Sequence, residues 1–245
     1  MNNNKGFTLV EIIVTLAIAM IMTTIIYVAI NSTQWSATGI ERKVTAQQDE
    51  KAALSIMEME IRMASYNPLF IADNLLWRNA DCSAPPSASP AYKGIQEATA
   101  SSLAIQMDIN DNGVITATSA DPNEIIKYNY DTDAADRYIT RTTNCAGGAQ
   151  PFLGAAGGSG VVKTVNVINN ELGMPVFRYY DGAGTEIFPT TANPAPIPDI
   201  RRIDITLAVE TEYIDPATKQ KRRMIYSTSV IVRNHAPAAP VIPEK

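Results

Sequence analysis

The residue with the clearest chemical potential in this chain is Glu11, a carboxylate within an otherwise uncharged apolar segment. As a helix, residues 7–30 would extend about 36 Å, enough to cross a bilayer core of about 30 Å. An ionisable side chain inside a membrane helix is costly and is usually kept for a partner. Cleavage between Gly6 and Phe7 would supply one, because Glu11 could neutralise the new α-amino group of a neighbouring subunit.

Two simpler interpretations of this segment remain open. A secretory signal peptide has an apolar core of about 7 to 15 residues followed by a small-residue cleavage site. The apolar core here is longer, and residues 23–27 offer no such site. A plain signal anchor accounts for the length but gives no role to the Gly6–Phe7 junction or to Glu11. Cleavage after Gly6 explains all of these features.

The run from Gly6 to Glu11, GFTLVE, resembles the class III signal of type IV prepilins and type II secretion pseudopilins. This resemblance implies cleavage after Gly6 by prepilin peptidase, N-methylation of Phe7 and an assembly contact at Glu11. It also implies an α+β, pilin-like fold, in which a long N-terminal helix, transmembrane in its first half, packs by its second half on an antiparallel β-sheet. The implied partners are other pilin and minor pilin subunits, prepilin peptidase, the inner-membrane assembly platform and, before assembly, membrane lipid.

A single helix is predicted from about residue 8 to residue 65, because no proline occurs before Pro68. Gly39 is its weakest point, and local fraying is expected there. Apolar residues at helical spacing predict a face that packs on the sheet, formed by Ala53, Leu54, Met57, Ile61 and Ala64. Segments 47–49 and 57–64 resemble the end of the first helix in PilW-like minor pilins, and the J-type minor pseudopilin has a similar segment.

The remainder of the chain is predicted to be β-rich. Short runs of Ile, Val, Thr and Tyr predict strands at 102–109, 114–118, 124–130, 138–142, 161–168 and 176–180. Alternating residues predict a central hairpin formed by 203–209 and 224–232. Prolines and glycines predict irregular segments at 68–100 and 147–160. The expected organisation is a leader at 1–6, a membrane helix at 7–30, its amphipathic second half at 31–66, a globular domain at 67–236 and a Pro-rich tail at 237–245.

One loop has the residue types of a calcium site. Asp108, Asn110 and Asn112 alternate ahead of Gly113, as in the first half of a calcium-binding loop. The second half departs from that pattern, because Ser119 stands where a bidentate glutamate is required. The other interpretation is a hairpin turn, which the Asn112-Gly113 dipeptide favours. No cofactor is expected apart from this candidate calcium ion.

The two cysteines, Cys82 and Cys145, fall in the part that an N-terminal-in anchor places outside the cytoplasm, where disulfides persist. A bridge between them would close a loop of about 64 residues and stabilise the domain by about 4 kcal/mol in the chain-entropy model. The alternative is two unrelated thiols. A metal pair is disfavoured, because the single histidine, His235, is remote in sequence.

Composition and side-chain types argue against two classes of function. A net charge of −5 without a basic stripe argues against binding nucleic acid. Catalysis is not expected, because His235 stands at the edge of the Pro-rich tail and no triad can be built on it.

Two function classes remain. The first is a structural subunit, a minor pilin that initiates or joins a type IV pilus and contributes to adhesion or motility, with a minor pseudopilin of type II secretion as the alternative. Segment 121–130 and the Arg233-Asn234 ending are more similar to PilW-like sequences and favour the pilin. The second class is a membrane-tethered binding or adhesive module. The expected location is the inner membrane, single-pass with the C-terminal domain outside the cytoplasm, and then the pilus surface.

Overall fold

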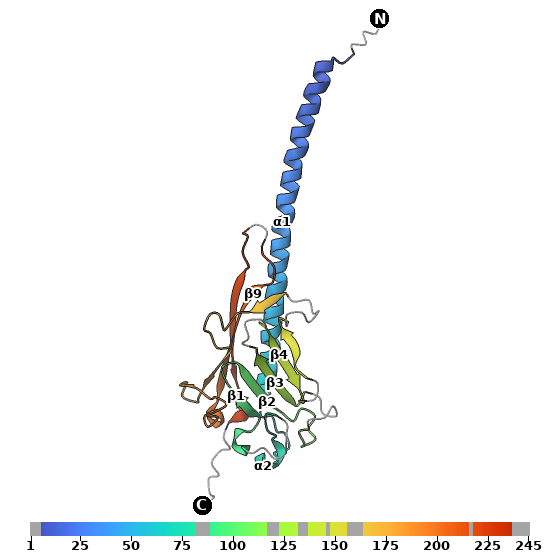
Figure 1. The fold of residues 1–245 in the computed structure, drawn as a ribbon. Coiled ribbons are helices and arrows are strands. Elements are labelled where there is room, and N and C mark those ends of the chain that lie inside the picture. The colour runs from blue at the N-terminus through green and yellow to red at the C-terminus, as the bar shows by residue number, and fades with distance from the viewer. Residues whose placement is uncertain are drawn as a thin grey trace, which may run out of the picture.

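One helix, α1 (Leu9–Arg62), dominates the structure, and its first half projects clear of the β-rich domain (Figure 1). The structure is a computed structural model that describes residues 6–81, 89–116, 123–131, 137–145, 148–155, 164–215 and 218–236. The helix is continuous for 54 residues, since no proline interrupts it. The prediction of a single long N-terminal helix is confirmed.

Two antiparallel sheets of five strands each form the domain, where the sequence predicted one. In the first sheet the strands pair in chain order: β1 (Ile95–Ala98), β2 (Ser102–Gln106), β3 (Ile125–Tyr130), β4 (Ile139–Thr143) and β5 (Gln150–Leu153). In the second sheet the strands are β6 (Val165–Val167), β7 (Phe177–Tyr180), β8 (Glu186–Ile187), β9 (Arg202–Thr211) and β10 (Arg223–Ile231). Strand β9 is central, because it pairs with β10, β7 and β6. The predicted hairpin is therefore present, with β9 inside the sheet.

The second half of α1 packs against both sheets through one continuous core. The five residues of the predicted apolar face are all buried, and side chains of both sheets belong to the same cluster. Following the same helical stripe toward the N-terminus reaches Ala46 and Glu50, which are both fully buried. The expected packing of the helix on antiparallel β-structure is confirmed.

Polar contacts fix α1 between the two sheets. The Glu60 carboxylate accepts hydrogen bonds from Arg141 Nη2 at 2.6 Å and Nε at 3.2 Å, and a third from the Tyr128 hydroxyl. Glu58 accepts a hydrogen bond of 3.2 Å from Thr228 on β10. Two acidic residues two positions apart thus face opposite sheets and set the rotation of the helix about its axis.

The C-terminal end of α1 is joined to the first sheet at a close backbone contact. Ser65 N–H donates to the Gln106 carbonyl at 2.9 Å, and Gly94 N–H donates to Ser65 Oγ at 3.0 Å. A Cβ atom on Gly94 would lie 2.3 Å from the Gln106 carbonyl oxygen, so this position requires glycine.

His235 closes this junction from the other end of the chain. Its ring nitrogens contact Ser65 Oγ at 2.8 Å and the Ile197 carbonyl at 3.0 Å, and the side chain is 1% exposed. The expectation that His235 lies at a frayed edge is wrong. Residues 237–245, the predicted tail, lie outside the described residues.

Two local predictions are also wrong. Residues 114–116 are not in a strand, because Ile115 is buried with Leu76 and Trp77 beside the short helix α2 (Asp73–Leu76). Strands β1 and β5 lie in segments predicted as irregular. Each gains its backbone partners from a longer neighbouring strand, β2 or β4.

Gly39 lies within α1, so the expected fraying there is wrong as well. A Cβ atom on Gly39 would lie 3.2 Å from Asp215 Oδ1, on the loop that joins β9 to β10. The glycine therefore permits close approach of this loop to the helix.

Candidate functional site

The predicted processing site lies at the start of α1, where a capping box orders the chain. Thr8 is the N-cap in an extended conformation, and its hydroxyl accepts a hydrogen bond from Glu11 N–H at 3.3 Å. Glu11 Oε2 accepts in return from Thr8 N–H at 3.0 Å. Thr8 is a helix-capping residue whose role the motif-based prediction missed, although Thr-x-x-Glu is a sequence signature of this cap.

The cap places the Glu11 carboxylate one residue from the amine that cleavage would create. Oε2 is bound to the amide of Thr8, and Thr8 directly follows Phe7. The unpaired N–H groups at a helix N-terminus also favour a negative charge here. Glu11 is thus held where it can neutralise an α-amino group of its own chain or of a neighbouring one.

The cleavage junction is open on all sides. The Phe7 side chain is 84% exposed, and a Cβ atom on Gly6 would meet nothing within 4 Å. Nothing in the described chain therefore requires glycine at this position.

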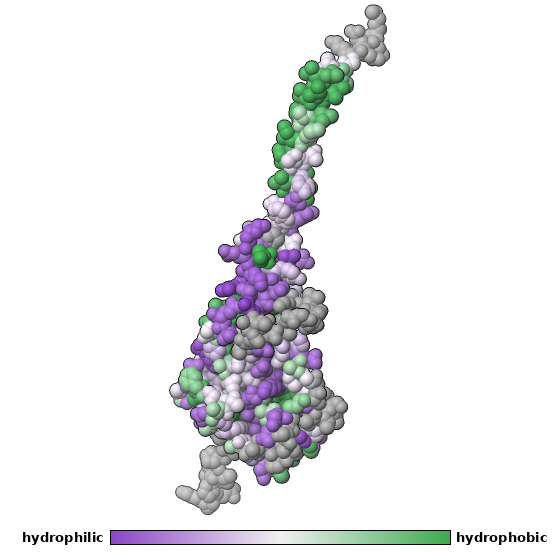
Figure 2. Space-filling model, viewed as in Figure 1, coloured by the Kyte–Doolittle hydropathy of each residue, from purple (hydrophilic) through white to green (hydrophobic). Residues whose placement is uncertain are grey.

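The first half of α1 exposes apolar side chains around its circumference, and Figure 2 shows the apolar surface on the face in view. From Leu9 to Ile30 every large apolar side chain is at least half exposed. The helix is long and apolar enough to cross a membrane, and none of its most apolar window is buried inside the protein. A surface of this kind is stable only in lipid or among similar helices.

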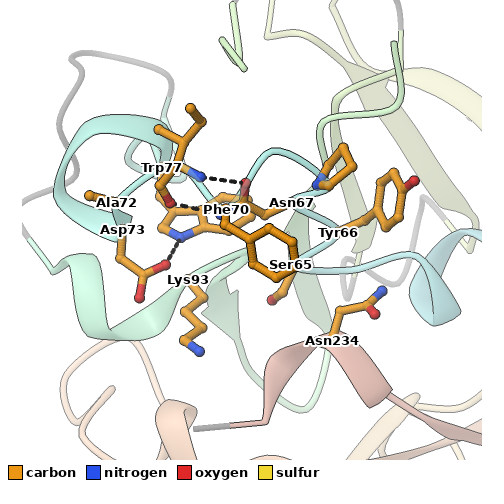
Figure 3. Close-up of a pocket in the computed structure, with 11 residues that line it drawn as sticks. Ser65, Tyr66, Asn67, Phe70, Ala72, Asp73, Trp77, Lys93 and Asn234 are labelled. Carbon is orange, nitrogen blue, oxygen red and sulfur yellow. Dashed lines mark hydrogen bonds between the residues drawn. The ribbon is translucent and has the colours of Figure 1, made fainter. Parts of the chain in front are cut away.

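A second candidate region lies at the opposite end of α1, where a cavity of about 610 Å³ opens beside the helix terminus (Figure 3). Phe70 at its rim is 90% exposed and has a left-handed backbone, with φ of 54°. Asp73 accepts a hydrogen bond of 2.8 Å from the indole N–H of Trp77, which forms part of the wall. The cavity combines apolar walls with a few fixed polar groups, as binding sites do.

The three residues of the predicted calcium loop lie together. Asp108 is buried and accepts hydrogen bonds from Asn112 N–H at 3.2 Å and Gly113 N–H at 2.9 Å. Asn110 Oδ1 accepts from Asn112 N–H at 3.0 Å, and Asn112 Oδ1 from Val114 N–H at 2.8 Å. These bonds close the loop without an ion. Residues 114–116, the described part of the predicted second strand, are not in a strand, and β2 pairs instead with β3. Calcium binding stays a prediction.

The predicted disulfide falls partly outside the described residues. Cys145 follows β4, and none of the described cysteines is a free thiol. Cys82 is not among the described residues. The pairing of Cys82 with Cys145 stays a prediction.

Comparison with known proteins bears on the N-terminal site. A family model described as the prokaryotic N-terminal methylation motif matches residues 1–27. No curated protein and no solved structure matches the chain. The matched residues contain the Gly6–Phe7 junction, Glu11 and most of the exposed apolar half of α1. A motif of this type is typical of proteins processed by prepilin peptidase, so the match supports the resemblance to type IV prepilins and pseudopilins.

Proposed function

We propose that this protein is a minor pilin, a structural subunit that initiates or joins assembly of a type IV pilus after processing by prepilin peptidase. The observation that carries the proposal is the first half of α1, which is exposed on all sides although the attached domain has a complete core of its own. In water such a helix would aggregate. Bundled with like helices, it forms the core of a filament.

Each residue of the motif has a separate role in this proposal. Gly6 marks the bond that is cut, and Phe7 provides the new α-amino group and receives the methyl group. Glu11, held in place by the Thr8 cap, supplies the opposing charge when the helix enters an apolar bundle. No catalytic role is proposed for the protein itself.

The proposed partners follow from the same features. Other pilin and minor pilin subunits would cover the apolar half of α1, and the inner-membrane assembly platform would receive the processed chain. Before assembly the helix would lie in the inner membrane with the domain outside the cytoplasm, and afterwards the domain would lie on the pilus.

A type IV pilus is favoured over a secretion pseudopilus by the PilW-like segments at 121–130 and 233–234. Deletion of the gene, with separate assays for surface pili and for secreted proteins, tests this assignment. We expect loss or shortening of pili with normal secretion. Normal pili with loss of secretion would instead assign the protein to a pseudopilus.

A second candidate function, an adhesive module, is favoured by the cavity beside Phe70. An exposed aromatic side chain on a left-handed backbone is strained and gains nothing from burial within this chain. If this end of the domain is adhesive, Phe70→Ser reduces adhesion while pilus number stays normal. Unchanged adhesion of Phe70→Ser cells would remove this candidate function.

A further inference from the structure

A band of aromatic, aliphatic and basic side chains lies around α1 between its apolar half and the domain. We call this band the collar; its residues are Trp35, Arg42, Lys43, Tyr213, Ile214 and Lys219. The first three lie on α1, and the others lie on the loop that joins β9 to β10. Trp35, Tyr213 and Ile214 are each 55% exposed. They fall within one band instead of being scattered singly, and an exposed apolar patch of this kind marks an interaction surface.

The collar is held together by contacts between the helix and the loop. Lys219 Nζ lies 5.9 Å from the centre of the Trp35 ring, and the Arg42 guanidinium lies 4.8 Å from the centre of the Tyr213 ring. Asp215, which lies against Gly39, is paired with Arg222 at 2.6 Å. Figure 1 shows the β9–β10 loop reaching along α1 toward its apolar half. The loop therefore has a fixed position relative to the membrane helix.

The part of the collar nearest the membrane, Trp35 with Lys219 beside it, lies at the depth of the lipid headgroups, whereas Arg42 and Lys43 lie about 18 to 20 Å beyond Ile30 along the helix. Trp35 is five residues beyond Ile30, a rise of about 7.5 Å along a helix. A headgroup layer occupies about 5 to 8 Å on each side of the hydrocarbon core. If the core ends near Ile30, the Trp35 ring lies in this layer. The contact between Lys219 and Trp35 brings the β9–β10 loop to the same level.

The chemistry of the collar matches this layer. Tryptophan and tyrosine are enriched at membrane interfaces, where one part of the ring is apolar and the other wet. Lys219 provides positive charge for lipid phosphates at this level, while Asp215 is already paired with Arg222. Arg42, Lys43 and the acid beside them, Glu41, lie farther from the membrane along α1.

We propose that the collar binds the headgroups of anionic phospholipids, so that the β9–β10 loop holds the domain against the membrane before assembly. The inference rests on the membrane-anchored state in the proposed function and not on membership of a filament. It gives the β9–β10 loop a role that the prepilin motif does not imply.

Fluorescence quenching in vesicles tests this proposal with the full chain. The vesicles would contain phosphatidylglycerol and phosphatidylcholine, with some phosphatidylcholine carrying a nitroxide on its headgroup. Trp35→Phe with Ile214→Trp moves the reporter to the loop and keeps a ring beneath Lys219. Trp77 is 1% exposed and gives a constant background.

The matched control is Trp35→Phe with Ile231→Trp. Ile231 is also exposed, at 59%, but lies at the far end of β10, about 26 Å from Arg223 at about 3.3 Å per residue. We expect strong quenching of the reporter at position 214 and almost none at position 231. Equal, weak quenching at both positions would overturn the proposal.

A charge variant tests the choice of lipid. Adding Lys219→Gln should lower the docking equilibrium by about fivefold in anionic vesicles. Quenching that is unchanged by the Lys219→Gln substitution and is equal in pure phosphatidylcholine vesicles would contradict anionic recognition. Quenching that appears only when the protein is crowded in the vesicle would show that the collar packs on a second subunit, which also overturns the proposal.

Flotation of the same vesicles separates failure of this proposal from failure of membrane anchoring. Protein that floats with the vesicles but shows no quenching at position 214 would still be anchored through α1. Protein that does not float would contradict the membrane-anchored state itself.

Discussion

The two halves of α1 are made of the same continuous helix but are built for different surroundings. Residues 7–30 expose apolar side chains on every face, whereas the second half buries one stripe between two sheets and leaves polar residues in water. The single charge in the first half is at its cap, while the second half carries charges throughout. Stability of the domain and assembly of the chain should therefore depend on different residues.

Replacing Glu11 should separate these two properties most strongly. Glu11→Ala should be processed and retained in the membrane, because it removes an ionisable side chain, which is unfavourable within a membrane helix. The domain should melt as in wild type, since Glu11 lies outside its core. Incorporation into sheared pili should fall severely, because the α-amino group in the bundle loses its counter-charge.

Thr8→Ala provides the control for this variant. It removes the capping hydroxyl, at a cost of about 1 kcal/mol to the helix, but keeps the carboxylate. Its incorporation should stay close to wild type. If Glu11→Ala enters filaments as well as wild type, Glu11 is not an assembly contact.

A variant at the junction of α1 with the first sheet should instead change the stability of the domain. Gly94→Ala should destabilise the domain by more than about 3 kcal/mol, because the added methyl group would collide with backbone atoms that cannot move independently. Gly182→Ala is the control, since its Cβ atom would meet only Arg201 Cγ at 3.7 Å. Thermal melting of both variants measures the difference. A Gly94→Ala chain that melts like Gly182→Ala would contradict the described junction.

Glu50 makes the stability of the second half depend on pH. Burial raises the pKa of Glu50 to about 7, and neither carboxylate oxygen has a hydrogen-bond partner among the described residues. The folded state therefore binds this proton more tightly than the unfolded state, so this contribution falls as pH rises from about 4.5 to about 7. The total change is about 3 kcal/mol.

Glu50→Gln should remove this dependence and be more stable than wild type above pH 7. Burial also lowers the pKa of His235 to about 4, which gives an opposite slope, with stability lost as pH falls from about 6.5 toward 4. Because His235 is present in both proteins, the difference between their denaturation curves isolates Glu50. A difference that does not vary between pH 4.5 and 7 would contradict the buried, unpaired carboxylate.

The smallest expected effect concerns the loop at Asp108. Asp108→Ala removes the acceptor of two backbone hydrogen bonds and should cost about 2 kcal/mol. Melting with and without calcium tests the ion separately. A calcium-dependent rise in melting temperature that Asp108→Ala abolishes would establish the calcium site. A melting temperature that calcium does not change would show that the loop is closed by its own hydrogen bonds and binds no calcium.

Much of the fold could be predicted where the signal is local. The helix length follows from the absence of proline, and its buried face follows from the spacing of Ala53, Met57 and Ile61. Extending that stripe by four-residue steps would also have identified Glu50 as buried. The processing site was predicted from its motif. The Thr8 cap was missed, although its Thr-x-x-Glu signature is equally local.

The remainder depends on contacts distant in sequence. Strands β1 and β5 are short, and their pairing with longer neighbours is not visible in their own residues. His235 is buried only because Ser65 and Ile197 meet it from elsewhere in the chain. The division into two sheets likewise depends on how α1 is covered from both sides.

The most direct test of the central claim is the intact mass of the protein extracted from the membranes of its native cells. Cleavage at the Gly6–Phe7 junction predicts a chain that has lost residues 1–6 and gained one methyl group on the amine of Phe7. A full-length chain in cells with an active prepilin peptidase would contradict the account.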